Sequence, residues 1–151
     1  MNMPPLIVKN SISINAPVSK VWDVLVNPEQ TKKYMFGCEA ISDWRIGSSL
    51  IWRGLYEGKE MIFVKGNIVE CKPGKLLTYT VIDPNSGIAD LPENYLDVTY
   101  ELSEENGITT LTATQGDYST VGDGANRYRH TVEGGGWDPI LVEIKKLVEA
   151  D

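Results

Sequence analysis

Few side chains in this sequence could carry out covalent chemistry, and their arrangement argues against it. The sequence holds one histidine, His130, and two cysteines, Cys38 and Cys71. Nucleophilic catalysis needs a nucleophile, a general base and a group that orients the base. No G-x-S-x-G motif is present, and the cysteines form no CxxC pair. We therefore expect an exposed loop position for His130 and free, buried thiols for the two cysteines.

Metal and cofactor sites find no support either. One histidine and two distant cysteines do not have the spacing of a zinc site. The glycines at 134–136 precede a helix, but GGGWDP is neither a dinucleotide-binding nor a Walker motif. Glu133 and Asp138 place negative charge beside these glycines, which disfavours a phosphate. The sequence predicts no metal and no cofactor.

Charged residues within the expected strands offer a weaker indication of catalysis. Arg45, Arg53, Glu60 and Asp97 could supply polar groups to a cavity. No two of them have a spacing that requires a joint role. Because charged side chains on strands usually face water, we expect these four to be solvent-exposed.

The elements that would position such residues follow from apolar periodicity. Residues 6–14 alternate and predict a strand. A short helix over 17–25 buries Val18, Val21, Trp22 and Leu25, and a second begins where Asn27 caps and Pro28 fits the first turn. The range 137–148 carries a sustained helical stripe that includes Leu141 and Ile144.

Between Cys38 and Asp117 the pattern changes to β-branched and aromatic runs that end in turn signals. Pro73-Gly74 and Asn106-Gly107 are the clearest turns, and the second is typical of a hairpin. Strands joined by such short loops must be antiparallel. The order predicts an α+β fold: a strand, two short helices, about six more strands and a long helix.

Composition narrows the classes of partner. The 151 residues predict a single domain over 1–151, long enough to bury its own core. The net charge of −7 argues against nucleic-acid binding and against anionic membrane surfaces. No segment has the pattern of a signal peptide or a membrane span, which predicts no membrane insertion and a cytoplasmic location. The oligomeric state, monomer or homodimer, is left open.

The order of elements resembles the START-like (SRPBCC) superfamily. Three stretches carry the likeness: INAPVSKVWDVLVNPEQTKKY, GNIVECKPGKLLTYT and GGGWDPILVEIKKLVE. The chain is most similar to the group named after the activator of the heat-shock-protein-ninety ATPase. The resemblance implies a helix-grip fold of the Bet v type, in which a curved antiparallel sheet of six to seven strands wraps around a long C-terminal helix. It implies an apolar cavity more than it implies an activity.

A sheet that grips one helix leaves space that side chains do not fill, so we expect an apolar pocket between the two. Aromatic rings in the right segments could form its wall, and their O–H or N–H groups could orient a ligand. The expected ligand-binding residues are Trp52, Tyr56, Tyr79, Tyr100, Trp137 and Leu141. Whether Trp52 or Arg53 faces the core is not decided by alternation.

Three functions fit this expectation. The first is binding of a small, largely apolar molecule, lipid-like or aromatic, without catalysis. The second is a polyketide cyclase- or aromatase-like enzyme that uses the same cavity. The third is a chaperone cofactor or other protein-binding module. The sequence favours the first and leaves the others open.

The entrance to the last helix is unusual because three glycines precede Trp137. The range 118–136 is long for a connector, and residues 126–133 predict a helical turn or two beside the cavity mouth. The glycines could act as a hinge for a cover over the cavity, or they could let the backbone pack closely on the sheet. The sequence favours neither interpretation.

Overall fold

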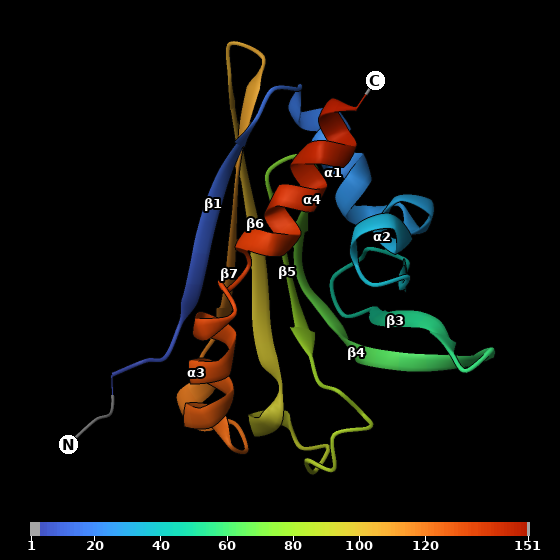
Figure 1. Ribbon diagram of the computed structural model, residues 1–151, viewed down its shortest axis with the longest axis vertical. Helices are drawn as coiled ribbons and strands as arrows, with labels where there is room; N and C mark the ends of the chain where they lie inside the picture. The colour runs from blue at the N-terminus through green and yellow to red at the C-terminus, as the bar shows by residue number, and fades with distance from the viewer. Residues whose placement is uncertain (1–3, 151) are drawn as a thin grey trace.

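The computed structural model describes residues 4–150, and an antiparallel sheet organises them (Figure 1). Its seven strands are β1 (Val8–Ile14), β2 (Glu39–Ser42), β3 (Ser49–Tyr56), β4 (Lys59–Lys72), β5 (Leu76–Val81), β6 (Leu96–Glu105) and β7 (Ile108–Gly116). Their order across the sheet is β1-β7-β6-β5-β4-β3-β2. All neighbours from β2 to β7 are antiparallel, as the sequence predicts; short turns join β3 to β4, β4 to β5 and β6 to β7, whereas a longer loop that contains η1 joins β5 to β6. The first strand instead pairs with the last, so β1 and β2 form the two edges.

Four α-helices occur within the described residues. They are α1 (Val18–Val26), α2 (Pro28–Tyr34), α3 (Gly124–Glu133) and α4 (Asp138–Glu149), and two short 3₁₀ turns, η1 (Pro92–Asn94) and η2 (Tyr118–Thr120), lie in loops. In Figure 1, α4 crosses in front of the sheet, with α1 and α2 beside it and α3 below. Contacts join α4 to β1, α1 and α2. This is the predicted α+β helix-grip fold.

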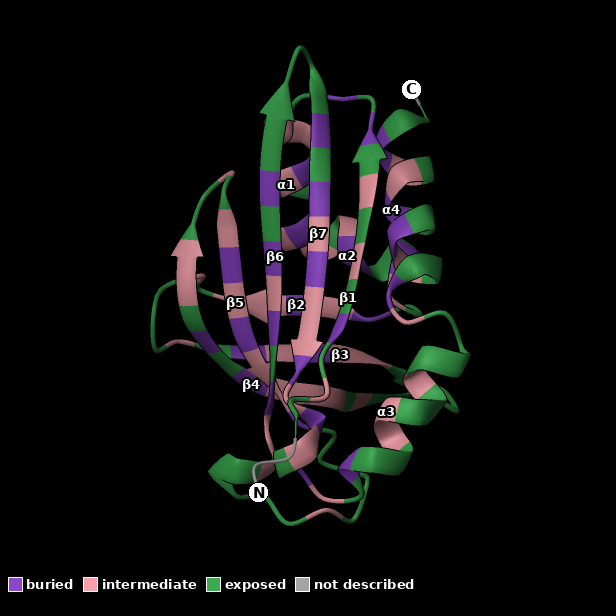
Figure 2. Cartoon of the chain, turned by 90° about the vertical axis from the view of Figure 1, so that its left-hand side faces the viewer, coloured by how far each residue is buried: buried purple, intermediate pink, exposed green. Residues whose placement is uncertain are grey.

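Burial follows the two periodicities that the sequence shows. From Leu96 to Leu102 in β6 and from Thr109 to Ala113 in β7 every second residue is buried, and Figure 2 shows this alternation along the strands. In α4 the buried residues are Leu141, Ile144 and Val148, one face of the helix. Side chains from these surfaces form one hydrophobic cluster between the concave face of the sheet and the helices.

The sheet bends most strongly along β4, whose 14 residues curve away in Figure 1. The pairing of β4 is interrupted by irregularities beside Trp52 on one side and Ile68 on the other. Gly66 lies against the backbone of Thr80 so closely that a side chain there would collide with it. Irregular pairing and a missing side chain let a strand bend, and here they create the concave face that receives α4.

Three expectations about local structure need correction. Residues 126–133 belong to a full helix, α3, which begins at Gly124 after Asp123 adopts a left-handed conformation (φ 54°). His130 is exposed as expected, but on this helix and not in a loop. Both cysteines are free, yet only Cys38 is buried, because Cys71 lies half-buried near the end of β4. Among residues 4–150, no helix has the length and apolar character needed to cross a membrane.

Candidate functional site

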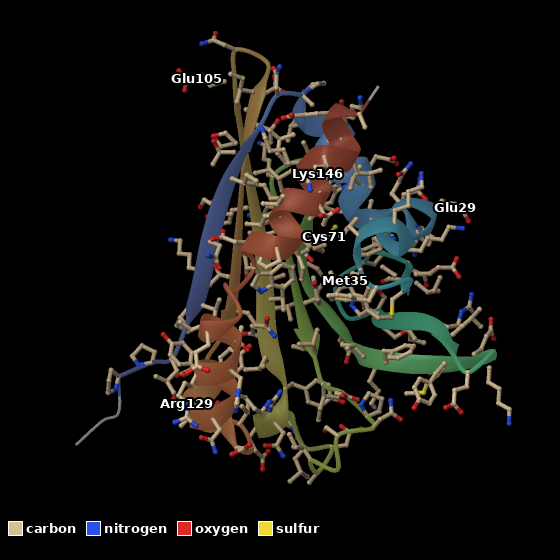
Figure 3. All side chains as sticks on the ribbon, viewed as in Figure 1. Glu29, Met35, Cys71, Glu105, Arg129 and Lys146 are labelled. Atoms are coloured by element: carbon tan, nitrogen blue, oxygen red, sulfur yellow. The ribbon has the colours of Figure 1, made fainter. Side chains whose placement is uncertain are left out.

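A cavity of about 410 Å³ lies between the concave face of the sheet and the start of α4. This volume is within the range of small-molecule sites. Most of its lining is aliphatic, aromatic or sulfur-containing: Met35, Phe36, Cys38, Trp52, Phe63, Val64, Tyr79, Val81, Val98, Gln115, Trp137 and Ile140. Figure 3 shows Met35 just after α2, on the side of the helix that faces β3 and β4. Such a lining suits a ligand that is itself largely apolar.

A row of aromatic rings crosses the sheet beside the cavity. The ring of Tyr79 lies 6.1 Å from that of Trp52 and 5.6 Å from that of Tyr100, between ring centres. Tyr100 in turn meets Trp137 edge-on at 5.6 Å. The hydroxyl groups of Tyr79 and Tyr100 share a hydrogen bond of 2.8 Å. These contacts hold the rings in fixed orientations, so the wall they form is rigid.

The titratable groups at this wall are neutral at physiological pH. Burial raises the pKa of Tyr79 well above its ordinary value, and burial likewise raises the pKa of Tyr100. Burial also raises the pKa of the Cys38 thiol. Because desolvation disfavours the charged form of each group, the phenols and the thiol keep their protons. The lining therefore presents no charge to a ligand.

The structure brings together three of the six residues expected at the site. Trp52, Tyr79 and Trp137 line the cavity. Tyr100 and Leu141 are buried behind this wall, with 1% and 0% of their surfaces exposed. The question of Trp52 or Arg53 is decided in favour of Trp52, which is buried on the concave face.

Tyr56 does not reach the cavity. It is the last residue of β3 and is 57% exposed, next to the turn at Glu57 and Gly58. Strand alternation places it on the same face as Trp52, but here the β3–β4 hairpin extends past the helices, as Figure 1 shows. Alternation predicts which face of the sheet a side chain is on, but it does not predict how far along the strand the helices cover that face.

The charged residues considered for catalysis all lie outside the lining. Arg45, Glu60 and Asp97 are exposed. Arg53 is half-exposed and lies between Glu39, 4.0 Å away, and Glu60, 3.8 Å away. Within residues 4–150, no cluster of three or more histidine, cysteine or carboxylate side chains could hold a metal ion.

Nine of the twelve lining residues were not among those expected from the sequence, and two of the nine, Phe36 and Gln115, hold distinctive positions. Phe36 is 87% exposed and marks the open side of the cavity. It has a left-handed backbone (φ 53°), as does the following Gly37 (φ 82°). A glycine just after a predicted helix is typical of a helix end, so Gly37 could have indicated that the chain turns sharply at this point. Gln115 is the other, and nothing in its strand pattern distinguishes it from the threonines around it.

The three glycines before α4 form the end of α3. Gly136 N–H donates to the Thr131 carbonyl (2.8 Å) and Gly135 N–H to that of Val132 (3.0 Å), with left-handed φ values of 61° and 95°. This is the Schellman arrangement. A side chain at Gly136 would come within 2.5 Å of Asn10 Oδ1 on β1. Close packing against the sheet is therefore what the geometry of Gly136 shows.

The range 118–136 does not border the cavity, contrary to expectation. None of its residues is in the lining, and α3 instead contacts η2 and β1. The rings of Tyr118 and Tyr128 meet edge-on with centres 5.9 Å apart, which fixes α3 on η2. The cover proposed for these residues thus has no counterpart in this arrangement.

Comparison with known proteins supports the fold. A model of the family described as Activator of Hsp90 ATPase homolog 1-like protein matches residues 15–149. The solution structure of ChR145 from Cytophaga hutchinsonii is 36% identical, with a TM-score of 0.78, and the match covers 99% of this chain and 97% of that one. A search of curated proteins finds no match.

Two more distant structures share the fold. CalU16 from Micromonospora echinospora is 23% identical, with a TM-score of 0.66, over 96% of this chain and 75% of its own. The Aha1 dimer from Colwellia psychrerythraea is 15% identical, with a TM-score of 0.68, over 95% of this chain and 96% of its own. At these identities the likeness concerns the fold alone.

Proposed function

The chain belongs to the family of Activator of Hsp90 ATPase homolog 1-like proteins, and on that premise we propose that it binds a small, largely apolar molecule in the cavity between the sheet and α4. The carrying observation is the lining itself: aliphatic and aromatic side chains enclose about 410 Å³ and offer few polar groups. Burial of apolar surface is worth roughly 25 cal/mol per Å², so a ligand that fills this space gains affinity mainly by leaving water.

Binding without turnover is the function that the cavity favours. General acid–base catalysis needs groups whose pKa lies near the working pH. Here burial moves the pKa of Tyr79 and of Tyr100 upward, away from neutrality. The carboxylates and guanidinium groups considered for a cyclase lie outside the lining. No specific observation favours the cyclase or the chaperone-cofactor alternative. A cytoplasmic location stays a prediction, and the choice between monomer and homodimer stays open.

A cavity-filling substitution tests the proposal. Val81 is half-buried in the lining, and Val81→Phe would place a ring in the ligand space. Val69→Phe makes the same change on β4 at a side chain that is 46% exposed and outside the lining. Fluorescence titration with 1-aminoanthracene, an uncharged apolar probe, should show binding to the wild type and the control, and binding at least several-fold weaker to Val81→Phe.

Two results would count against the proposal. One is no binding of the probe by the wild type, and the other is equal binding by all three proteins. Native mass spectrometry of the freshly purified protein supplies an independent measurement. A retained small molecule that is lost in Val81→Phe and kept in Val69→Phe would identify the natural ligand.

A further inference from the structure

Among the described residues, Gln115 is the one carboxamide in the cavity lining, and it points from β7 towards the start of α4. It pairs in register with Val98 on β6 and Val8 on β1, both of which are buried on the concave face. Its Oε1 accepts a hydrogen bond of 3.0 Å from the indole Nε1 of Trp137. The side chain of Gln115 therefore links the sheet, at β7, to the residue that precedes α4.

The orientation of this carboxamide is fixed by chemistry. An indole N–H can only donate, so the oxygen of Gln115 must face Trp137 and the amino group must face away. Trp137 is itself held in place, because its backbone N–H donates to Asn10 Oδ1 at 2.9 Å and its ring packs on Tyr100. The amino group of Gln115 is thus aimed before any ligand arrives.

Gln115 is a residue of the lining, and its Nε2 amino group has no acceptor among residues 4–150. Of the other polar groups of the lining residues, the hydroxyl of Tyr79 is already bonded to Tyr100 and the indole N–H of Trp137 to Gln115, whereas the indole N–H of Trp52 has no acceptor among residues 4–150. An oxygen atom of a ligand could accept a hydrogen bond from one of these free N–H groups. A donor left without a partner when a ligand expels water costs about as much as a lost hydrogen bond.

Neither an anionic nor a cationic ligand would find a charged partner in the lining. The part of the chain that the structure describes brings no lysine, arginine or histidine to the lining that could pair with an anion, and no aspartate or glutamate that could pair with a cation. Burying an unpaired charge in an apolar space costs far more than burying a hydrogen-bonded dipole.

We infer that the cavity selects uncharged apolar molecules that carry a hydrogen-bond acceptor, such as a ketone or other carbonyl oxygen, and that Gln115 Nε2 binds this acceptor. This inference rests on the proposed function and adds a ligand class and a specificity-determining residue to it. A purely structural Gln115, which only supports Trp137, would not distinguish between ligands with and without an acceptor.

Two planar probes of nearly equal shape separate these cases. 9-Fluorenone carries a carbonyl group where fluorene carries a methylene group. Calorimetric titration of both probes gives the ratio of their dissociation constants, Kd(fluorene)/Kd(fluorenone), for each protein. Comparing this ratio between proteins cancels the difference in hydrophobicity between the probes. In Gln115→Met, which keeps length and loses the donor, the ratio should fall about two- to tenfold relative to wild type.

Control variants keep the result interpretable. Gln30→Met makes the same substitution on α2, outside the lining, and should leave the ratio unchanged. Gln115→Glu keeps an oxygen for Trp137 but replaces the donor, so it should also lower the ratio and serves if Gln115→Met folds poorly. Fluorene-9-carboxylate tests the charge, and the wild type should bind it at least about tenfold more weakly than fluorenone.

Each outcome has a distinct meaning. If both neutral probes bind and the ratio is the same in wild type and the Gln115 variants, this inference fails while the proposed function stands. Tight binding of the carboxylate would overturn the preference for uncharged ligands. If neither neutral probe binds the wild type and Val81→Phe changes nothing, the proposed function fails and this inference fails with it.

Discussion

The indole Nε1 of Trp137 donates a hydrogen bond of 3.0 Å to Oε1 of Gln115, which joins the residue before α4 to strand β7. Trp137 is 6% exposed and has a second anchor in Asn10, which accepts from its backbone N–H. Trp137 thus fixes where α4 begins, forms part of the cavity lining and orients the carboxamide of Gln115.

Trp137→Phe tests how much the hydrogen bond between Trp137 and Gln115 contributes to the stability of the fold. The substitution keeps an aromatic ring against Tyr100 and removes the N–H donor, so Gln115 loses its partner. We expect the free energy of unfolding to fall by about 1–3 kcal/mol, from the lost hydrogen bond and the smaller ring. Chemical denaturation measures the change. A midpoint equal to that of wild type would mean that the indole hydrogen bond does not stabilise the start of α4.

Gly136→Ala should be strongly destabilising, whereas Gly134→Ala should not. The left-handed conformation of Gly136 (φ 61°) costs an alanine about 1–2 kcal/mol, and its methyl group would press on Asn10 Oδ1. Gly134 has φ −83°, and a methyl group there meets only ordinary contacts, so alanine should stabilise by about 0.4–1 kcal/mol. Thermal unfolding of both variants compares them directly.

The opposite order of stabilities would disprove the packing role of Gly136. A hinge would show a different pattern: slower exchange of a bound probe in Gly134→Ala, with little change in stability at either position.

Leu141 should be among the most costly residues to truncate. It is fully buried on α4, so Leu141→Ala should lower the free energy of unfolding by about 2–5 kcal/mol. Val142, the next residue, is 40% exposed and provides a control whose truncation should cost much less. Denaturant titration of the two variants measures both losses of stability. Equal losses at Leu141 and Val142 would contradict the assignment of the buried face of α4.

The regular features of the fold could be predicted from the sequence because they depend on local periodicity. Alternation in β6 and β7 and the stripe of Leu141 and Ile144 each identify a buried face without knowledge of the partner. The cap of α2 is equally local, since Asn27 Oδ1 accepts from the N–H of Glu29 two residues on.

Features that join distant segments were not predictable. The first N–H of α1, at Val18, donates to Glu104, 86 positions away, and no local pattern encodes that bond. Gln115 gains its importance only because Trp137 folds against it. Tyr56 fails as a site residue for the same reason: the extent of the helical cover is decided by tertiary packing. The sequence could therefore indicate a cavity but not its polar group or its open side.

Asp117 should make stability depend on pH. The Ser119 hydroxyl and the backbone N–H groups of Leu6 and Ser119 donate to its carboxylate and hold the pKa of Asp117 below its ordinary value. Since the folded pKa is lower than the unfolded one, this stabilisation is complete above about pH 3.9 and is lost as the pH falls through the folded pKa.

Asp117→Asn should accordingly unfold at a lower temperature than wild type at pH 7, and the difference should narrow below about pH 4. Asp43→Asn is the control, because Asp43 is exposed and its side chain accepts no hydrogen bond within residues 4–150. A constant difference between Asp117→Asn and wild type from pH 7 to pH 2 would contradict a contribution from the charge.

Phe36 should contribute to binding at the expense of stability. Its ring is 87% exposed, so it gains little from burial, while its left-handed backbone (φ 53°) is unfavourable by about 1–2 kcal/mol for a bulky residue. Asparagine tolerates this conformation, so Phe36→Asn should leave the free energy of unfolding unchanged or raise it by up to about 1 kcal/mol.

The same variant removes the apolar edge of the cavity and should weaken binding of 1-aminoanthracene several-fold. Phe36→Met restores an apolar contact with the ligand and should recover much of the affinity without the gain in stability. Denaturation and probe titration on the three proteins measure both quantities, and a variant Phe36→Asn that loses stability but binds like wild type would assign Phe36 a purely structural role.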